Sequence, residues 1–321
     1  MKPKLLAALL CLCTYTAQCW GFYAHRQINY YAVFLLPPQM LQLYKPHILF
    51  LADHAVDPDK RRYAVPQEAP RHYIDLDRYG AFPFDSLPRG WNAAVTRYTE
   101  DTLQAHGIVP WWIAIMQARL TEAFRQKDAA RILKLSAELG HYVADAHVPL
   151  HATANYNGQL TGQQGIHGFW ESRVPELLAA SEWSFYLGKA VYIGNPQAFI
   201  WERVLQSAAA ADTVLRTERD LSAAFNPDQK FAFEPRNGTL VRQYSTAFTK
   251  AFNQRLNGMV ERRMQQSIAA VASLWFTAWV DAGQPVLQTG AQPLFTLEDE
   301  QEWEQLNNAW KGGGTLQRAH E

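Results

Sequence analysis

The stretch from residue 138 to residue 171 constrains the fold more than any other part of the chain, because it is rich in side chains that can bind a metal ion. His141 and Asp145 are four residues apart, and so are His167 and Glu171, so on a helix each pair lies on one face. The residues between His141 and Asp145 are apolar or small, and a carboxylate in such a dry setting needs a partner. The candidate ligands in this stretch are His141, Asp145, His147, His151, His167 and Glu171.

Two interpretations of these pairs compete. For any single pair, a buried polar helix face held by hydrogen bonds is the simpler one. Two pairs with His151 between them favour a metal site instead. Imidazole nitrogens and carboxylate oxygens are the ligands that zinc takes where no thiolate is available. The sequence therefore predicts a zinc site built on helices.

The composition is that of a globular protein without a strong overall charge. Of the 321 residues, 48% are hydrophobic and 19% are charged, which is not the balance of a disordered chain. Basic residues number 30 and acidic residues also 30, so no overall field gathers a polyanion. This balance counts mildly against a nucleic-acid-binding protein, although a local basic patch remains compatible with it.

Residues 1–19 are typical of a secretory signal peptide. Lys2 and Lys4 supply the positive start, and the apolar run that follows is too short to span a bilayer. Small residues precede the bond before Trp20, where we expect cleavage. We therefore expect an exported protein, either periplasmic or secreted.

All three cysteines, Cys11, Cys13 and Cys19, fall in this segment, so the expected mature chain contains neither a disulfide nor a thiolate ligand. An exported protein without disulfides depends on its core or on bound metal for stability. A lipoprotein acylated at Cys19 is the alternative, and Thr16 and Gln18 disfavour it.

The remaining sequence predicts a single, largely helical domain at residues 20–283 and a peripheral tail at residues 284–321. Apolar residues recur at helical spacing almost throughout, and alternation typical of strands is scarce. Residues 231–238 are expected to form a loop. Helices are expected at residues 30–36, 39–52, 91–102, 110–127, 129–147, 166–181, 196–211, 213–224 and 242–282.

With these motifs in place, the sequence resembles the superfamily of zinc-dependent phospholipases C and single-strand-specific zinc nucleases. The resemblance covers residues 20–171 and, more loosely, the helices up to about residue 282. It implies an all-α, multi-helix single domain with three zinc ions in a cleft. It rests on Trp20 with His25, on Asp57, on HYID at residues 72–75, on HYVADAHVPLH at residues 141–151 and on HGFWE at residues 167–171.

The resemblance also implies which residues hold each zinc ion. The shared ligand, Asp145, would set the separation of two ions, and Asp57 would also be the catalytic residue that orients or deprotonates the attacking water. No ligand role is implied for His147. The implied ligands are Asp57, His72, His141 and Asp145 for one ion, His151, His167 and Glu171 for a second, and the amino and carbonyl groups of Trp20 with His25 and Asp145 for a third.

The expected function is hydrolysis of phosphate esters by metal-activated water, as in a zinc-dependent phospholipase C. The alternative is a single-strand nuclease or 3′-nucleotidase with the same zinc site. The spacing of Trp20 and His25 is similar to that of the nucleases, whereas the short loop before His167 and the glutamate at 171 are similar to the phospholipases. The expected partner is a phosphodiester substrate, either a phospholipid or single-stranded nucleic acid. Transient contact with a membrane surface fits the first, and no obligate protein partner is evident.

A third alternative is a secreted zinc-binding module without catalytic turnover. Two of the implied sites have only three unshared protein donors, which leaves room for a water molecule. Closed structural zinc sites usually have four protein ligands. The ligand inventory therefore disfavours the non-catalytic alternative.

We predict that zinc content and activity depend on a free amino group at Trp20. An amine binds zinc only when it is deprotonated and uncapped, and its pKa of about 7.7–8.0 lets a metal displace the proton. A protein that starts at Trp20 should therefore bind about one more zinc ion than one that starts at Met–Trp20. Metal analysis and phosphodiesterase assays on both proteins test this, and equal zinc with equal rates would refute the terminal chelate.

Overall fold

The computed structural model of this chain describes residues 22–236, 239–287 and 294–313. Among these residues, helices make up 69% and strands 4%, so the prediction of a single all-α domain is confirmed. The expected signal peptide and Trp20 lie outside the described residues. Among the described helices, none combines the length and apolar character needed to cross a membrane.

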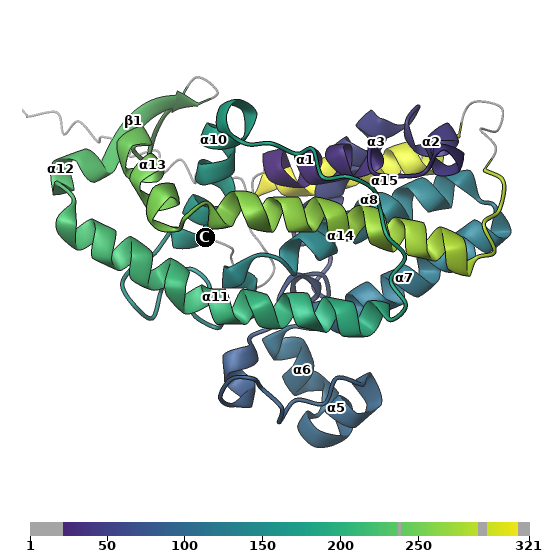
Figure 1. The fold of residues 1–321 in the computed structure, drawn as a ribbon, viewed down its shortest axis with the longest axis horizontal. Helices are drawn as coiled ribbons and strands as arrows, with labels where there is room; N and C mark the ends of the chain where they lie inside the picture. Colours follow the sequence, from purple (N-terminus) through teal and green to yellow (C-terminus); the bar gives the residue numbers. More distant parts are fainter. Residues whose placement is uncertain (1–21, 237–238, 288–293, 314–321) are drawn as a thin grey trace, which may run out of the picture.

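The helices surround a core to which α8 contributes buried residues along its whole length (Figure 1). Short 3₁₀ turns, η1 (His54–Val56), η2 (Ala69–His72), η3 (Leu76–Tyr79) and η4 (Pro149–Ala152), and a π turn, η5 (Phe169–Arg173), connect several of them. The α-helices are α1 (Phe22–Val33), α2 (Pro38–Tyr44), α3 (Ile48–Asp53), α4 (Asp57–Arg61), α5 (Trp91–Tyr98), α6 (Glu100–His106), α7 (Val109–Gln126), α8 (Ala129–Asp145), α9 (Ile166–Gly168), α10 (Val174–Glu182), α11 (Pro196–Ala224), α12 (Pro227–Lys230), α13 (Thr246–Arg255), α14 (Met259–Asp281) and α15 (Leu297–Gly312).

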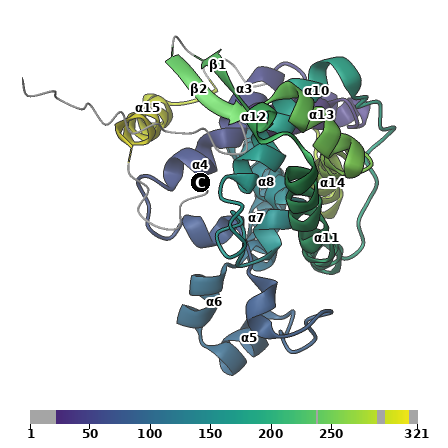
Figure 2. The ribbon, with the colours of Figure 1, turned by 90° about the vertical axis from the view of Figure 1, so that its left-hand side faces the viewer.

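Helix α8 packs against α1, α3, α7 and α14, while α5 and α6 project from one side of the bundle (Figure 2). The long helices α11 and α14 run side by side in both views, and buried Arg263 of α14 joins them by donating to Ser207 Oγ and to the carbonyl of Arg203. The same guanidinium donates to the carbonyl of His147 at 2.7 Å, just beyond the end of α8. Arg263 therefore joins both long helices to the start of the segment that follows α8.

Asn29 and Gly140 hold α1 tightly against α8. The Asn29 side-chain amide donates to the carbonyls of Leu51 and Ala137, each at 3.0 Å. A Cβ atom at position 140 would lie 1.9 Å from Asn29 Oδ1, so only glycine allows this approach. Asn29 lies one helical turn beyond His25, so the same contact brings His25 to α8.

The region after α11 differs from the sequence prediction in two places. Residues 231–236, predicted to be a loop, form β1 (Phe231–Arg236), which pairs antiparallel with β2 (Thr239–Tyr244). The sequence signal for this hairpin is Asn237–Gly238, a favoured two-residue turn between strands. The helix predicted at residues 242–282 is two helices, α13 and α14, because the chain turns at Asn257 and Gly258, which have φ of 51° and 69°.

Part of the tail that was expected to be peripheral is packed against the domain. Residues 297–312 form α15, which lies along α4 (Figure 2). Trp303 of α15 lies 4.2 Å from the His54 ring and 5.5 Å from the Phe50 ring, measured between centroids, and Phe295 stacks on Phe50 at 4.2 Å. Leu306 is buried, and Lys134 of α8 forms an ion pair with Asp299. The C-terminal helix is therefore part of the fold.

We predict that Trp303→Ala destabilises the whole domain, because it removes the ring that joins α15 to Phe50 and His54. Since Trp303 is half-buried, the expected loss is about 1–2 kcal/mol, below the cost of truncating a fully buried ring. This corresponds to a fall of roughly 2–8 °C in Tm. Thermal unfolding of Trp303→Ala and of the exposed control Glu302→Ala tests this, and equal Tm values for the two variants would contradict it.

Candidate metal centre

The structure brings eight potential metal ligands together in three buried groups. Within each group, one ligand atom from every residue lies within 4.8 Å of the others, and His141 belongs to two groups. Every one of these side chains is almost completely buried. The first group is His25, His141 and Asp145, the second is Asp59, His72 and His141, and the third is His151, His167 and Glu171.

The Asp145 carboxylate links the first group to the second. Its Oδ1 atom lies 3.4 Å from His25 Nε2, and its Oδ2 atom lies 3.0 Å from His72 Nδ1 and 3.2 Å from His141 Nε2. The His25 ring stacks on His141 with centroids 3.9 Å apart, so the two imidazoles lie next to each other. A carboxylate with its two oxygens directed to different donor sets has the geometry of a bridging ligand.

The second group contains Asp59, whereas the sequence analysis assigned this position to Asp57. Asp59 Oδ1 lies 3.8 Å from His72 Nδ1 and 3.7 Å from His141 Nε2. The Asp57 carboxylate instead accepts from His54 Nδ1 at 2.5 Å and from Lys60 Nζ at 3.0 Å. Both aspartates belong to α4, and residues two apart on a helix point in nearly opposite directions, so only one can face the cluster.

The third group lies on the segment that follows α8, in η4, α9 and η5. Pro149 begins η4 and redirects the chain, which places His151 apart from α8. The Asn157 side-chain oxygen then accepts from the backbone N–H of Gly165 at 2.9 Å and of His167 at 3.3 Å, which starts α9. The π turn η5 follows and carries Glu171. Turns of this kind occur often at functional sites.

Three acceptor atoms converge in this third group. Glu171 Oε2 lies 2.8 Å from His167 Nε2 and 3.4 Å from His151 Nε2, and the two nitrogens are 3.1 Å apart. Burial raises the pKa of Glu171 to about 7, because the carboxylate lacks a sufficient counter-charge.

Backbone contacts determine which histidine nitrogen faces the cluster. His141 Nδ1 lies 2.8 Å from the carbonyl oxygen of Ala55, His151 Nδ1 lies 2.5 Å from that of His72, and His167 Nδ1 lies 3.2 Å from that of Tyr156. A carbonyl only accepts, so each Nδ1 carries a proton, and the neutral form of each ring, which is the form that binds metal, presents its lone pair at Nε2. These tautomers follow from the hydrogen-bond network.

The donor set therefore fits a cation. In the third group, two nitrogen lone pairs and a carboxylate oxygen point at one another in a buried space, which is unfavourable unless a positive charge lies between them. Ligand atoms about 2.0–2.1 Å from a tetrahedral ion lie roughly 3.3–3.4 Å apart, close to the separations found here. Imidazole and carboxylate donors suit zinc among the divalent ions.

His147 is directed away from the three groups. Its Nδ1 atom bonds to the carbonyl oxygen of Val143 at 2.7 Å, and burial together with Arg263 lowers its pKa to about 3. The imidazole is therefore neutral, and His147 belongs to none of the three ligand groups. The Trp20 amine, expected beside His25, lies outside the described residues.

A cavity of about 470 Å³ lies between elements that supply or adjoin the ligands. It is lined by Arg26 of α1, by Lys60 of α4 and by the Phe22–Trp310 ring pair, whose centroids are 5.1 Å apart. Arg26 follows His25 and Lys60 follows Asp59 in the sequence, so two cations stand next to two candidate ligands. Glu176 also lines the cavity, and Arg26 and Lys60 form ion pairs with Asp53 and Asp57. The cavity therefore combines charged groups of both signs with aromatic surface.

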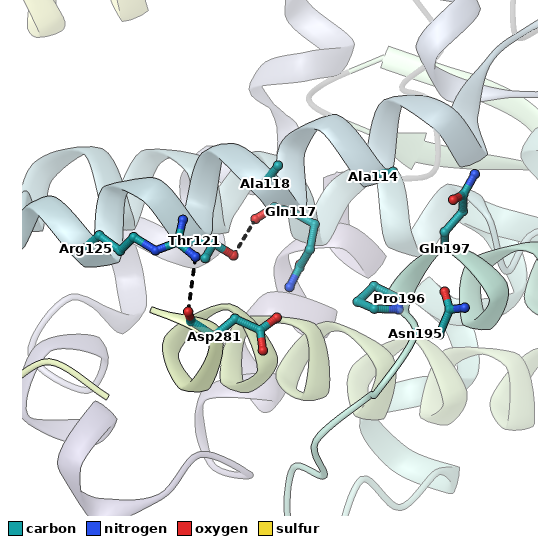
Figure 3. A pocket seen from close by; sticks show the side chains of 9 residues that line it. All are labelled: Ala114, Gln117, Ala118, Thr121, Arg125, Asn195, Pro196, Gln197 and Asp281. Carbon is teal, nitrogen blue, oxygen red and sulfur yellow. Dashed lines mark hydrogen bonds between the residues drawn. The ribbon is translucent and has the colours of Figure 1, made fainter. Parts of the chain in front are cut away.

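A second cavity, of about 600 Å³, lies away from these groups, between α7, the start of α11 and the end of α14 (Figure 3). Its charged lining residues are Arg125 and Asp281, and Arg125 Nη2 donates to the Asp281 carbonyl at 3.2 Å. The Thr121 hydroxyl donates a hydrogen bond to the carbonyl of Gln117 at 3.0 Å, within the same helix. Neither this cavity nor the 470 Å³ cavity is lined by a residue of the three ligand groups, but the latter is lined by Arg26 and Lys60, the sequence neighbours of His25 and Asp59. We therefore place the chemistry at the ligand groups themselves.

Comparisons with known proteins do not assign the chain. No protein-family model matches it, and no curated protein matches it.

We predict that removing metal destabilises the protein and that this loss grows with pH. In metal-free protein, the pKa of Glu171 is raised to about 7 and that of His141, beside Asp145 and Asp59, to about 9. A raised folded-state pKa contributes stability at low pH that is lost as pH rises through that value, so both groups act in the same direction. Bound metal replaces these protons as the counter-charge.

The measurement compares Tm before and after chelator treatment at about pH 5, 7 and 9. The difference in Tm should widen from the lowest pH to the highest. Metal analysis of untreated protein should find about three zinc ions. A difference in Tm that is absent, or that narrows with rising pH, would contradict the metal centre.

Proposed function

We propose that the protein is an exported, zinc-dependent hydrolase of phosphate esters, with a phosphodiester as substrate. The observation that carries this proposal is that His141 belongs to two ligand groups and that the Asp145 carboxylate of the first also contacts His72 of the second. Adjacent divalent ions suit phosphate esters because one substrate oxygen can contact more than one ion. The resemblance to zinc-dependent phospholipases C and zinc nucleases supports the same reaction.

The open coordination of these groups supports catalysis over a purely structural role. The third group has three protein donors, whereas closed structural zinc sites usually have four. Bound ions would polarise the phosphoryl oxygens and lower the pKa of a coordinated water. Arg26 and Lys60 in the neighbouring cavity would attract and orient the anionic ester.

Asp59 takes the catalytic role that the sequence analysis gave to Asp57. Its Oδ1 atom faces His72 and His141, while its buried Oδ2 atom has no hydrogen-bond partner among the described residues. That oxygen can accept a hydrogen bond from the attacking water and orient it, or take its proton. Asp57, already paired with His54 and Lys60, instead holds Lys60 at the cavity.

The alternative substrate class is single-stranded nucleic acid or a 3′-phosphorylated nucleotide. Trp310 favours it, since this partly exposed ring lines the 470 Å³ cavity and bases stack on aromatic side chains. Hydrolysis of phosphatidylcholine would support the phospholipase type, and hydrolysis of single-stranded DNA would support the nuclease type.

We predict that the purified protein hydrolyses a nitrophenyl phosphodiester and that Asp59→Asn lowers kcat/KM by about 10²-fold or more, because it removes a ligand and a proton acceptor. Asp57→Asn is the matched control, since it changes the same chemical group two residues away. It should leave zinc content intact and mainly raise KM, through a less well-held Lys60. A larger loss of zinc in Asp57→Asn than in Asp59→Asn would restore the original assignment, and no hydrolysis by zinc-loaded wild-type protein would refute the proposed function.

A further inference from the structure

Glu68 is a fully buried carboxylate outside the three ligand groups. It immediately precedes η2, the turn that ends at His72. Its Oε2 atom accepts from Arg71 Nη1 at 2.6 Å, its Oε1 atom lies 3.6 Å from Arg61 Nη1, and the Tyr142 hydroxyl donates to Oε1. Two guanidinium groups and a hydroxyl therefore fix this carboxylate in place.

The fourth neighbour of Glu68 is the ring of His72, a member of the second ligand group. His72 Nε2 lies 3.5 Å from Glu68 Oε1. The opposite nitrogen, Nδ1, lies 3.0 Å from Asp145 Oδ2 and 2.9 Å from His141 Nε2. His72 thus stands between the cluster on one side and Glu68 on the other.

His72 differs in this respect from the three histidines that backbone carbonyls orient. His141, His151 and His167 each direct Nδ1 to a main-chain oxygen and Nε2 to the cluster. His72 has the reverse orientation, with Nδ1 at the cluster, and the acceptor facing its Nε2 is the Glu68 side chain. To present a lone pair at Nδ1, the neutral ring must carry its proton on Nε2.

We propose that Glu68 is a positioning residue that keeps the proton of His72 on Nε2 and fixes the ring for metal binding. A carboxylate behind a metal-ligating histidine holds its tautomer and raises its basicity. The effect extends beyond the second group, because the carbonyl of His72 holds His151 Nδ1 at 2.5 Å and the N–H of Ile74 donates to the carbonyl of His151 at 2.9 Å. The proposal rests on the metal centre of the proposed function and does not depend on the reaction.

The test is the zinc affinity of Glu68→Gln, measured by competition with a chromophoric chelator on metal-stripped full-length mature protein. The amide keeps the volume of Glu68 but can donate to His72 Nε2, which would favour the wrong tautomer. We expect one zinc ion per molecule to bind about 10–100-fold more weakly. Glu218→Gln is the matched control, because it makes the same change at another buried carboxylate, one that bonds to Gln163, Ser222 and Lys230 and belongs to none of the ligand groups, and its zinc affinity should be unchanged.

A second readout separates positioning from general damage. In zinc-loaded wild-type protein, the Nε2–H proton of His72 should be shifted downfield and protected from exchange by Glu68, as seen by ¹H–¹⁵N NMR of the imidazole. In Glu68→Gln this proton should move upfield and exchange faster, while the signals of His167 stay in place. Such a localised change is not expected from loss of stability alone.

Glu68→Gln removes the negative charge that Arg61 and Arg71 share, and a variant with this imbalance in the core can fail to fold. The double variant Glu68→Gln/Arg71→Gln removes charge of both signs and keeps the test available if the single variant does not fold. Unchanged zinc affinity and an unchanged His72 signal in whichever variant folds would overturn the proposal. Wild-type protein that takes up no zinc would overturn it together with the metal centre, whereas zinc binding without hydrolysis would overturn the proposed function alone.

Discussion

The structure depends on a concentration of hydrogen-bond acceptors inside its core. Asp145 directs one oxygen to His25 and the other to His72 and His141, and these side chains are at most 2% exposed. Burying carboxylates and imidazole lone pairs together costs free energy unless cations occupy the space between them. Folding and cation uptake are therefore expected to be coupled, as in other proteins whose ligands converge only in the native state.

The sequence correctly predicts which side chains lie together where the spacing of residues along a helix alone determines it. The pairs His141/Asp145 and His167/Glu171 lie together because four-residue spacing on a helical turn leaves no alternative. The choice between Asp57 and Asp59 was not predictable in this way. Both flank Pro58 on one short helix, and which of them faces α8 depends on how α4 docks, which is a tertiary property. In the structure, the Asp57 carboxylate bonds to His54 and Lys60 and therefore does not face the ligand groups.

Two other features were missed for different reasons. The hairpin of β1 and β2 had a local signal in Asn237–Gly238, but Pro235 favoured a loop; a two-stranded sheet tolerates proline because both strands are edges. The packing of α15 had no local signal, since its partners, Phe50 and His54, are more than two hundred residues away in the sequence. Its capping box, made by Thr296 and Asp299, predicts where the helix begins but says nothing about what it contacts.

The position of α15 also gives the Asp57 carboxylate a structural role that does not depend on metal. Trp303 packs on His54, His54 bonds to Asp57, and Asp57 holds Lys60 at the cavity that Trp310 lines from the other side. One helix therefore contributes a wall of the cavity directly and supports its cation through a chain of contacts. Because α4 also carries Asp59 toward the ligand groups, a shift of α15 would reach both the cavity and the second group through the same short helix.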